Sequence, residues 1–163
     1  MNRRALLASS LALVGVVGLG AATIPLPDAG EGLRVLSAAE ARTCAALADA
    51  YFPPGNPLGV AAADVDLVGQ LDAHCADVYE REVVLAFRWA LRAVDAAVLT
   101  QGGDLAALSR DARRALVADW SENDLLPRRL LQDLLRMALG IAFFNTPEAR
   151  AAIGARPACG DPS

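Results

Sequence analysis

The sequence contains no lysine, one histidine and few aromatic residues, which make up 5% of the chain. Its glycines form neither a phosphate-binding loop nor a dinucleotide-binding fingerprint, and Ser9 and Ser109 lie in no nucleophile elbow. His74 has no second ligand at helical spacing except carboxylates such as Asp77, and no Cys-x-x-Cys or haem-attachment motif is present. These absences predict a chain without catalytic residues, cofactor or metal of its own.

Acidic residues outnumber basic ones, and the formal net charge is −4. Loss of Arg3 and Arg4 would make it −6, which argues against nucleic-acid binding. Four aspartates lie close together, but without the glycine turn and terminal glutamate of a calcium-binding loop. They are expected to cap helices and face solvent: Asp64, Asp66, Asp72 and Asp77.

The first 24 residues have the composition of an export signal. Arg3 and Arg4 precede a long apolar stretch of residues 5–24, and the arginine pair indicates the twin-arginine route. Small residues at Gly20-Ala21-Ala22 would permit cleavage after Ala22. An uncleaved anchor helix and an ordinary secretory signal are the alternatives. We therefore expect a periplasmic protein, or one on the outer face of the cytoplasmic membrane.

The chain has three cysteines, an odd number for an exported protein. Cys44 and Cys75 fall in helical patterns and are expected to be buried as small apolar side chains. Cys159 lies in a Pro/Gly-rich tail and is the best candidate for a disulfide. Its expected partner is another subunit, with Cys44 or Cys75 as the alternative.

The remainder of the chain predicts one compact, bundle-like, all-α domain of about five to six helices. Ser37 and Glu40 form a capping box for the first, and Asp64 is the expected N-cap of the second. The expected spans are 37–51, 64–74, 79–99, 109–120 and 127–144, with a short helix after Thr146. The expected divisions are a signal or anchor at 1–24, a linker at 25–35, the domain at 36–159 and a tail at 160–163.

The fifth predicted helix has no polar residue for two turns after Arg136, from Met137 to Phe144. A helix that is apolar on all sides is buried or covered by another molecule. Two interpretations follow: this is the central helix of the domain core, or one side meets a partner. The candidate interface residues are Met137, Ile141, Phe143 and Phe144.

Three stretches resemble the gluconate 2-dehydrogenase subunit 3 family. One is Leu36-Ser37-Ala38-Ala39-Glu40 followed by Ala46-Leu47-Ala48-Asp49 and Pro53-Pro54-Gly55. Another is Leu108-Ser109 with an arginine-rich helix after it, and the third is Phe143-Phe144-Asn145-Thr146-Pro147-Glu148, closed by Ile153-Gly154. The family's usual aromatic and glycine residues after this close are replaced by residues 155–159.

The resemblance implies a small, non-catalytic accessory subunit that escorts a large FAD-dependent sugar or alcohol dehydrogenase of the glucose-methanol-choline type. It also implies a haem c subunit as electron acceptor, FAD in the large subunit and export of the pair by the twin-arginine translocase. The alternative is a self-standing envelope protein, anchored by an uncleaved N-terminal helix, that acts as an interaction module.

Overall fold

Residues 26–99, 103–121 and 126–154 are described by the structure, a computed structural model. The predicted all-α class is confirmed, because these residues form helices and turns and no strand. The predicted signal with Arg3 and Arg4, and the predicted disulfide residue Cys159, lie outside them. The helices are α2 (Ala38–Tyr51), α3 (Leu67–Asp77), α4 (Arg81–Leu99), α5 (Arg110–Ser121), α6 (Leu126–Phe144) and α7 (Pro147–Ala152), with short 3₁₀ turns η2 (Ala62–Asp64) and η3 (Leu105–Ala107).

Side-chain caps fix the start of several helices. The capping box of α2 is present, since the Ser37 hydroxyl accepts from the Glu40 amide and the Glu40 carboxylate accepts from the Ser37 amide. At α7 the Thr146 hydroxyl accepts from the Ala149 amide at 3.4 Å, and Pro147 occupies the first helical turn. These local signals placed the starts of α2 and α7 correctly from sequence.

The predicted N-cap of the second helix was wrong. Asp64 ends the turn η2, where its carboxylate accepts from the Ala61 amide at 2.7 Å. Asp66 caps α3 instead, accepting from the Gly69 amide at 3.0 Å. Two aspartates of equal capping ability stand two residues apart, so the local sequence alone could not decide between them.

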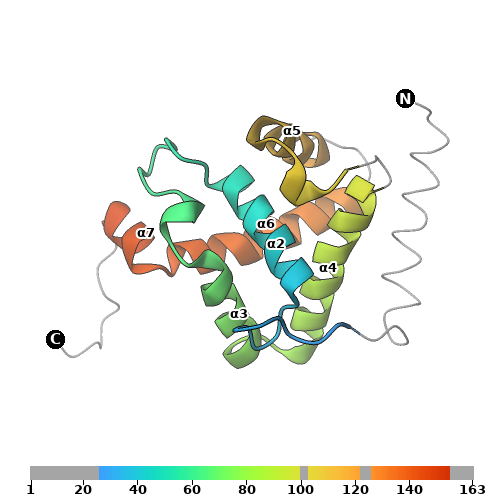
Figure 1. The fold of residues 1–163 in the computed structure, drawn as a ribbon. Helices are drawn as coiled ribbons and strands as arrows, with labels where there is room; N and C mark the ends of the chain where they lie inside the picture. Colours follow the sequence, from blue (N-terminus) through green and yellow to red (C-terminus); the bar gives the residue numbers. More distant parts are fainter. Residues whose placement is uncertain (1–25, 100–102, 122–125, 155–163) are drawn as a thin grey trace.

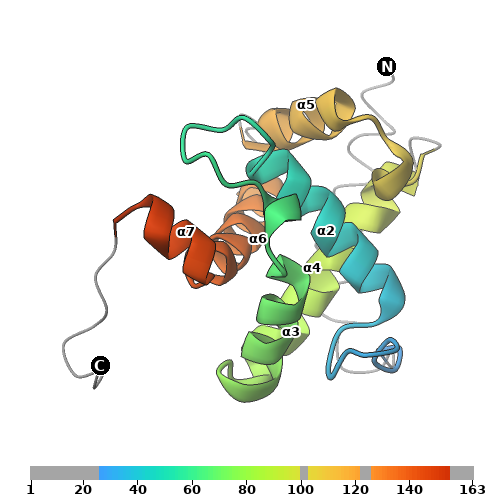
Figure 2. The same ribbon diagram turned by 60° about the vertical axis from the view of Figure 1, so that its left-hand side comes forward.

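Helix α6 runs through the middle of the fold and contacts α2, α3, α4, α5 and α7 (Figure 1). Helix α2 crosses over α6, and α3 and α4 each contact both of these helices (Figure 2). Helix α5 lies over one end of α6, and α7 extends from its other end. None of the helices among the described residues is long and apolar enough to cross a membrane.

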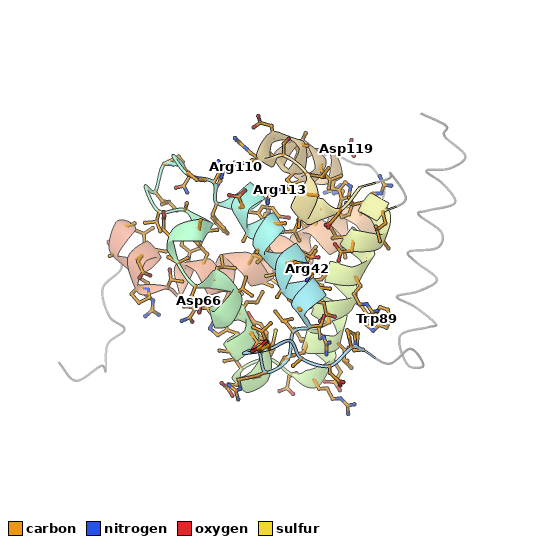
Figure 3. All side chains as sticks on the ribbon, in the orientation of Figure 1. Arg42, Asp66, Trp89, Arg110, Arg113 and Asp119 are labelled. Atoms are coloured by element: carbon orange, nitrogen blue, oxygen red, sulfur yellow. The ribbon has the colours of Figure 1, made fainter. Side chains whose placement is uncertain are left out.

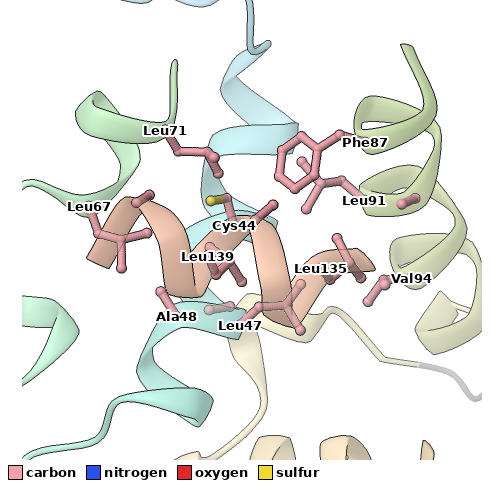
Figure 4. Packing of buried hydrophobic residues seen from close by; sticks show 14 of the residues in the cluster. Cys44, Leu47, Ala48, Leu67, Leu71, Phe87, Leu91, Val94, Leu135 and Leu139 are labelled. Atoms are coloured by element: carbon pink, nitrogen blue, oxygen red, sulfur yellow. The ribbon is translucent and has the colours of Figure 1, made fainter. Parts of the chain in front are cut away.

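The core forms where α2, α3, α4 and α6 meet (Figure 4). Leu135 and Leu139 of α6 lie between side chains of the other three helices, among them Leu71 and Phe87. Each of these four side chains is at most 2% exposed. Burial of a leucine or phenylalanine side chain contributes about 2 kcal/mol, so this junction is a main source of the domain's stability.

The predicted linker is bound to the body of the domain. We call residues Pro27–Leu36 the strap. The Asp72 carboxylate of α3 accepts from three consecutive strap amides, those of Arg34, Val35 and Leu36, at 2.7, 3.0 and 2.8 Å. On the surface, the Arg34 guanidinium pairs with Asp77, which lowers the pKa of the Asp77 carboxyl. The strap is therefore held by side chains of α3.

A buried ion pair holds the other end of the strap. The Arg88 guanidinium of α4 donates to the Glu40 carboxylate of α2 at 3.0 Å, and both side chains are largely buried. Arg88 also donates to the backbone carbonyl of Pro27 at 2.6 Å. At Gly30 the backbone lies so close to Ala38 that a Cβ would come within 2.8 Å of the Ala38 nitrogen. Strap, α2 and α4 therefore meet around one ion pair.

Candidate partner-binding surface

Helix α6 has two apolar sides in its second half, and only one of them is covered. Leu135, Leu139 and Ala142 point into the core and are at most 1% exposed. Met137, Ile141 and Phe144 lie on the opposite side and are 59%, 43% and 40% exposed. The core interpretation is confirmed for one side of this helix. The other side is apolar yet open, and the partner interpretation stays a prediction for it.

Phe143 does not belong to the candidate interface, because it is fully buried. Its ring stacks on that of Phe52 with centroids 4.0 Å apart and planes 6° apart. Phe52 follows α2 and is half-buried against the core. The neighbouring Phe143 and Phe144 thus serve different sides of α6, and only Phe144 lies at the surface.

Phe144 is held in place although it is exposed. Its ring makes edge contacts with Phe52 and Phe143, at centroid distances of 6.1 and 5.3 Å. Phe52 leads into the Pro-Pro-Gly loop, which the Asn56 side chain ties by donating to the carbonyls of Pro53 and Val60. Two of the stretches that carry the family resemblance therefore meet at this aromatic contact.

Gly140 lies between the exposed side chains. We define the α6 surface as Met137, Gly140, Ile141 and Phe144, whose spacing of three and four residues places them in one row. A Cβ built on Gly140 would meet no atom within 4 Å, so the packing of the described residues does not require glycine there. Leu130, 59% exposed, continues the row one heptad earlier.

Charged side chains border the α6 surface on its N-terminal side. Arg129, Asp133 and Arg136 are exposed, and a loose pair joins Arg136 to Asp133 at 4.0 Å. Burial raises the pKa of the nearby Tyr51 to about 12, with a lowering contribution from Arg136 and a raising one from Asp133. The surface is thus apolar in its centre and basic at this border.

The arginine-rich helix α5 is engaged within the chain. Arg110 and Arg113 both pair with Asp49 near the end of α2, with N···O distances of 3.1 Å (Figure 3). Arg113 also donates to the backbone carbonyl of Ala46 at 3.4 Å, in the second half of α2. These arginines therefore fasten α5 to α2.

The two described cysteines and His74 pack against other side chains of the domain. Cys44 and Cys75 are buried thiols, and burial raises their pKa values to about 12 and about 11. His74 makes an edge contact with Tyr79, with ring centroids 5.9 Å apart. Within the described ranges, no three His, Cys, Asp or Glu side chains group as potential metal ligands.

Sequence reasoning named Met137, Ile141 and Phe144, which are exposed in the structure, but it did not name Gly140 or Phe52. The sequence did contain a signal for Gly140, because a glycine inside a strongly helical pattern lowers helix stability and indicates a packing or functional role. The role of Phe52 depends on how α2 and α6 cross, which no local pattern records. Comparison of the chain with models of known protein families, with curated proteins and with solved structures found no match.

Proposed function

We propose that this chain is a non-catalytic accessory subunit that assembles with a flavin-dependent sugar or alcohol dehydrogenase and escorts it out of the cytoplasm. The observation that carries the proposal is the α6 surface, where three large apolar side chains are 40 to 59% exposed on the fold's central helix. Contiguous exposed apolar groups with a polar border are typical of protein interfaces.

The resemblance supplies the identity of the partner. The Pro-Pro-Gly stretch and the Phe-Phe-Asn-Thr-Pro stretch are far apart in sequence, and they meet through the ring of Phe52 beside Phe144. By this resemblance, the partner is a large subunit of the glucose-methanol-choline type that carries FAD, and a haem c subunit takes its electrons.

The export role rests on residues 1–24. A folded pair of subunits that shares one signal needs a route for folded proteins, which is the address that Arg3 and Arg4 indicate.

Gene deletion tests the proposal. Without the chain, dye-linked dehydrogenase activity should disappear from the periplasm, with the FAD protein misfolded or left in the cytoplasm, and the wild-type gene should restore it. The purified chain alone should show no flavin absorbance. Unchanged periplasmic activity after deletion would contradict the subunit role.

A second complementation separates the export route from the subunit role. Replacing Arg3 and Arg4 together by lysine keeps both positive charges but removes the twin-arginine motif. The variant should leave the dehydrogenase in the cytoplasm. Normal export of the Lys-Lys variant would refute the twin-arginine assignment. The subunit role would then still be decided by the gene deletion.

A further inference from the structure

The four residues of the α6 surface have the spacing of a helix-packing row. Positions 137, 140, 141 and 144 repeat at intervals of three and four, as do the contact positions between two packed helices. Phe144 is preoriented by its edge contacts with Phe52 and Phe143. A row of this length fits about two turns of one partner helix.

Gly140 indicates how close that partner comes. Glycine is among the least favourable residues in a helix interior, yet a side chain at this position would meet nothing within the described fold. The distance between two packed helices depends on the side chains at their contact. A glycine in the centre of the row lets a second backbone approach more closely than any other residue would allow.

The charge of α6 separates a foreign partner from a second copy. The border of the α6 surface carries Arg129 and Arg136 against Asp133, a net charge of +1 in a chain whose total is −4. Two copies that met through this surface would bring two basic borders together, which is unfavourable. A partner helix with one apolar side and acidic flanks would complement both the apolar row and the basic border.

We propose that the α6 surface binds an amphipathic helix of the dehydrogenase subunit, with its backbone closest at Gly140 and its acidic flanks beside Arg129 and Arg136. The apolar side of that helix covers Met137, Ile141 and Phe144. The identity of the subunit rests on the proposed function, whereas the helical, acid-flanked nature of the bound segment rests on α6.

Substitutions at Gly140 test the close approach. Gly140→Ala should raise the melting temperature of the isolated chain by about 2–4 °C, since alanine favours the helix, yet weaken the complex. Gly140→Leu should lower the amount of complex at least tenfold. The matched control is Ala96→Leu, which adds bulk at an exposed position inside α4. A Gly140→Leu variant that binds as well as the control would overturn the inference.

Photocross-linking from position 137 of the full chain, in its own host, identifies the occupant. A cross-link to an acid-flanked helix of an FAD protein supports both proposals. The same kind of helix in a protein without flavin supports this inference and contradicts the proposed partner. A cross-link to another copy, to residues 5–24 or to nothing would overturn the inference, and the deletion experiment would still decide the proposed function.

Discussion

The strap and the α6 surface differ in whether their side chains find partners within the chain. Around the strap, carboxylate and guanidinium groups meet backbone and side-chain partners from the strap, α2, α3 and α4, except for the buried Oε1 of Glu40, which has no hydrogen-bond partner. On the α6 surface, large apolar side chains stay exposed and a glycine has no neighbour to accommodate. Polar groups that are paired within the chain stabilise the fold, whereas apolar side chains that stay exposed indicate where the chain binds another molecule.

The comparison predicts opposite effects of substitution in the two regions. A change at the strap should cost folding free energy and leave binding by each folded molecule unchanged. A change at the α6 surface should not lower the free energy of unfolding by more than about 1 kcal/mol, and it should cost binding.

The largest expected effect is at the buried ion pair. Arg88→Ala leaves the buried Glu40 carboxylate without its guanidinium and should lower the free energy of unfolding by about 3–5 kcal/mol, measured by urea denaturation. The double variant Glu40→Gln with Arg88→Met removes both charges and should recover part of that loss. A loss below about 1 kcal/mol in Arg88→Ala would show that the pair does not hold the strap.

Substitution of Asp72 should cause the second-largest loss in the free energy of unfolding. Asp72→Ala leaves three strap amides without an acceptor, at an expected cost of about 2–4 kcal/mol. Asp72→Asn keeps the oxygen that Val35 and Leu36 use and loses the one that Arg34 uses, so it should cost less. Equal losses for the two variants would contradict the assignment of these bonds.

The helices themselves were largely predictable, because caps and breakers act locally. Ser37 with Glu40 and Thr146 with Pro147 marked helix starts that the structure contains. The strap was not predictable, since its Pro/Gly composition indicates a linker and its binding depends on Asp72 and Arg88 from distant helices. Neighbouring Phe143 and Phe144 could not be assigned to sides of α6 without Phe52.

The buried thiol of Cys44 should produce a smaller, pH-dependent effect. Burial raises its pKa from 9.0 to about 12, so the folded state keeps the proton after the unfolded state has lost it. Its stabilising contribution is complete below pH 9 and is lost as the pH rises toward 12. By pH 10 the loss should be on the order of 1 kcal/mol, and Cys44→Ala should reduce this dependence. An unchanged slope in the variant would contradict the assignment.

The most direct test of the central claim compares two aspartate substitutions at equally exposed sites. Ile141 on the α6 surface and Val83 on α4 are both 43% exposed. Ile141→Asp and Val83→Asp should each change the free energy of unfolding by less than about 1 kcal/mol. Only Ile141→Asp should abolish co-purification of the FAD dehydrogenase with the chain. Equal co-purification by the two variants, both folded, would contradict the claim that α6 presents the partner interface.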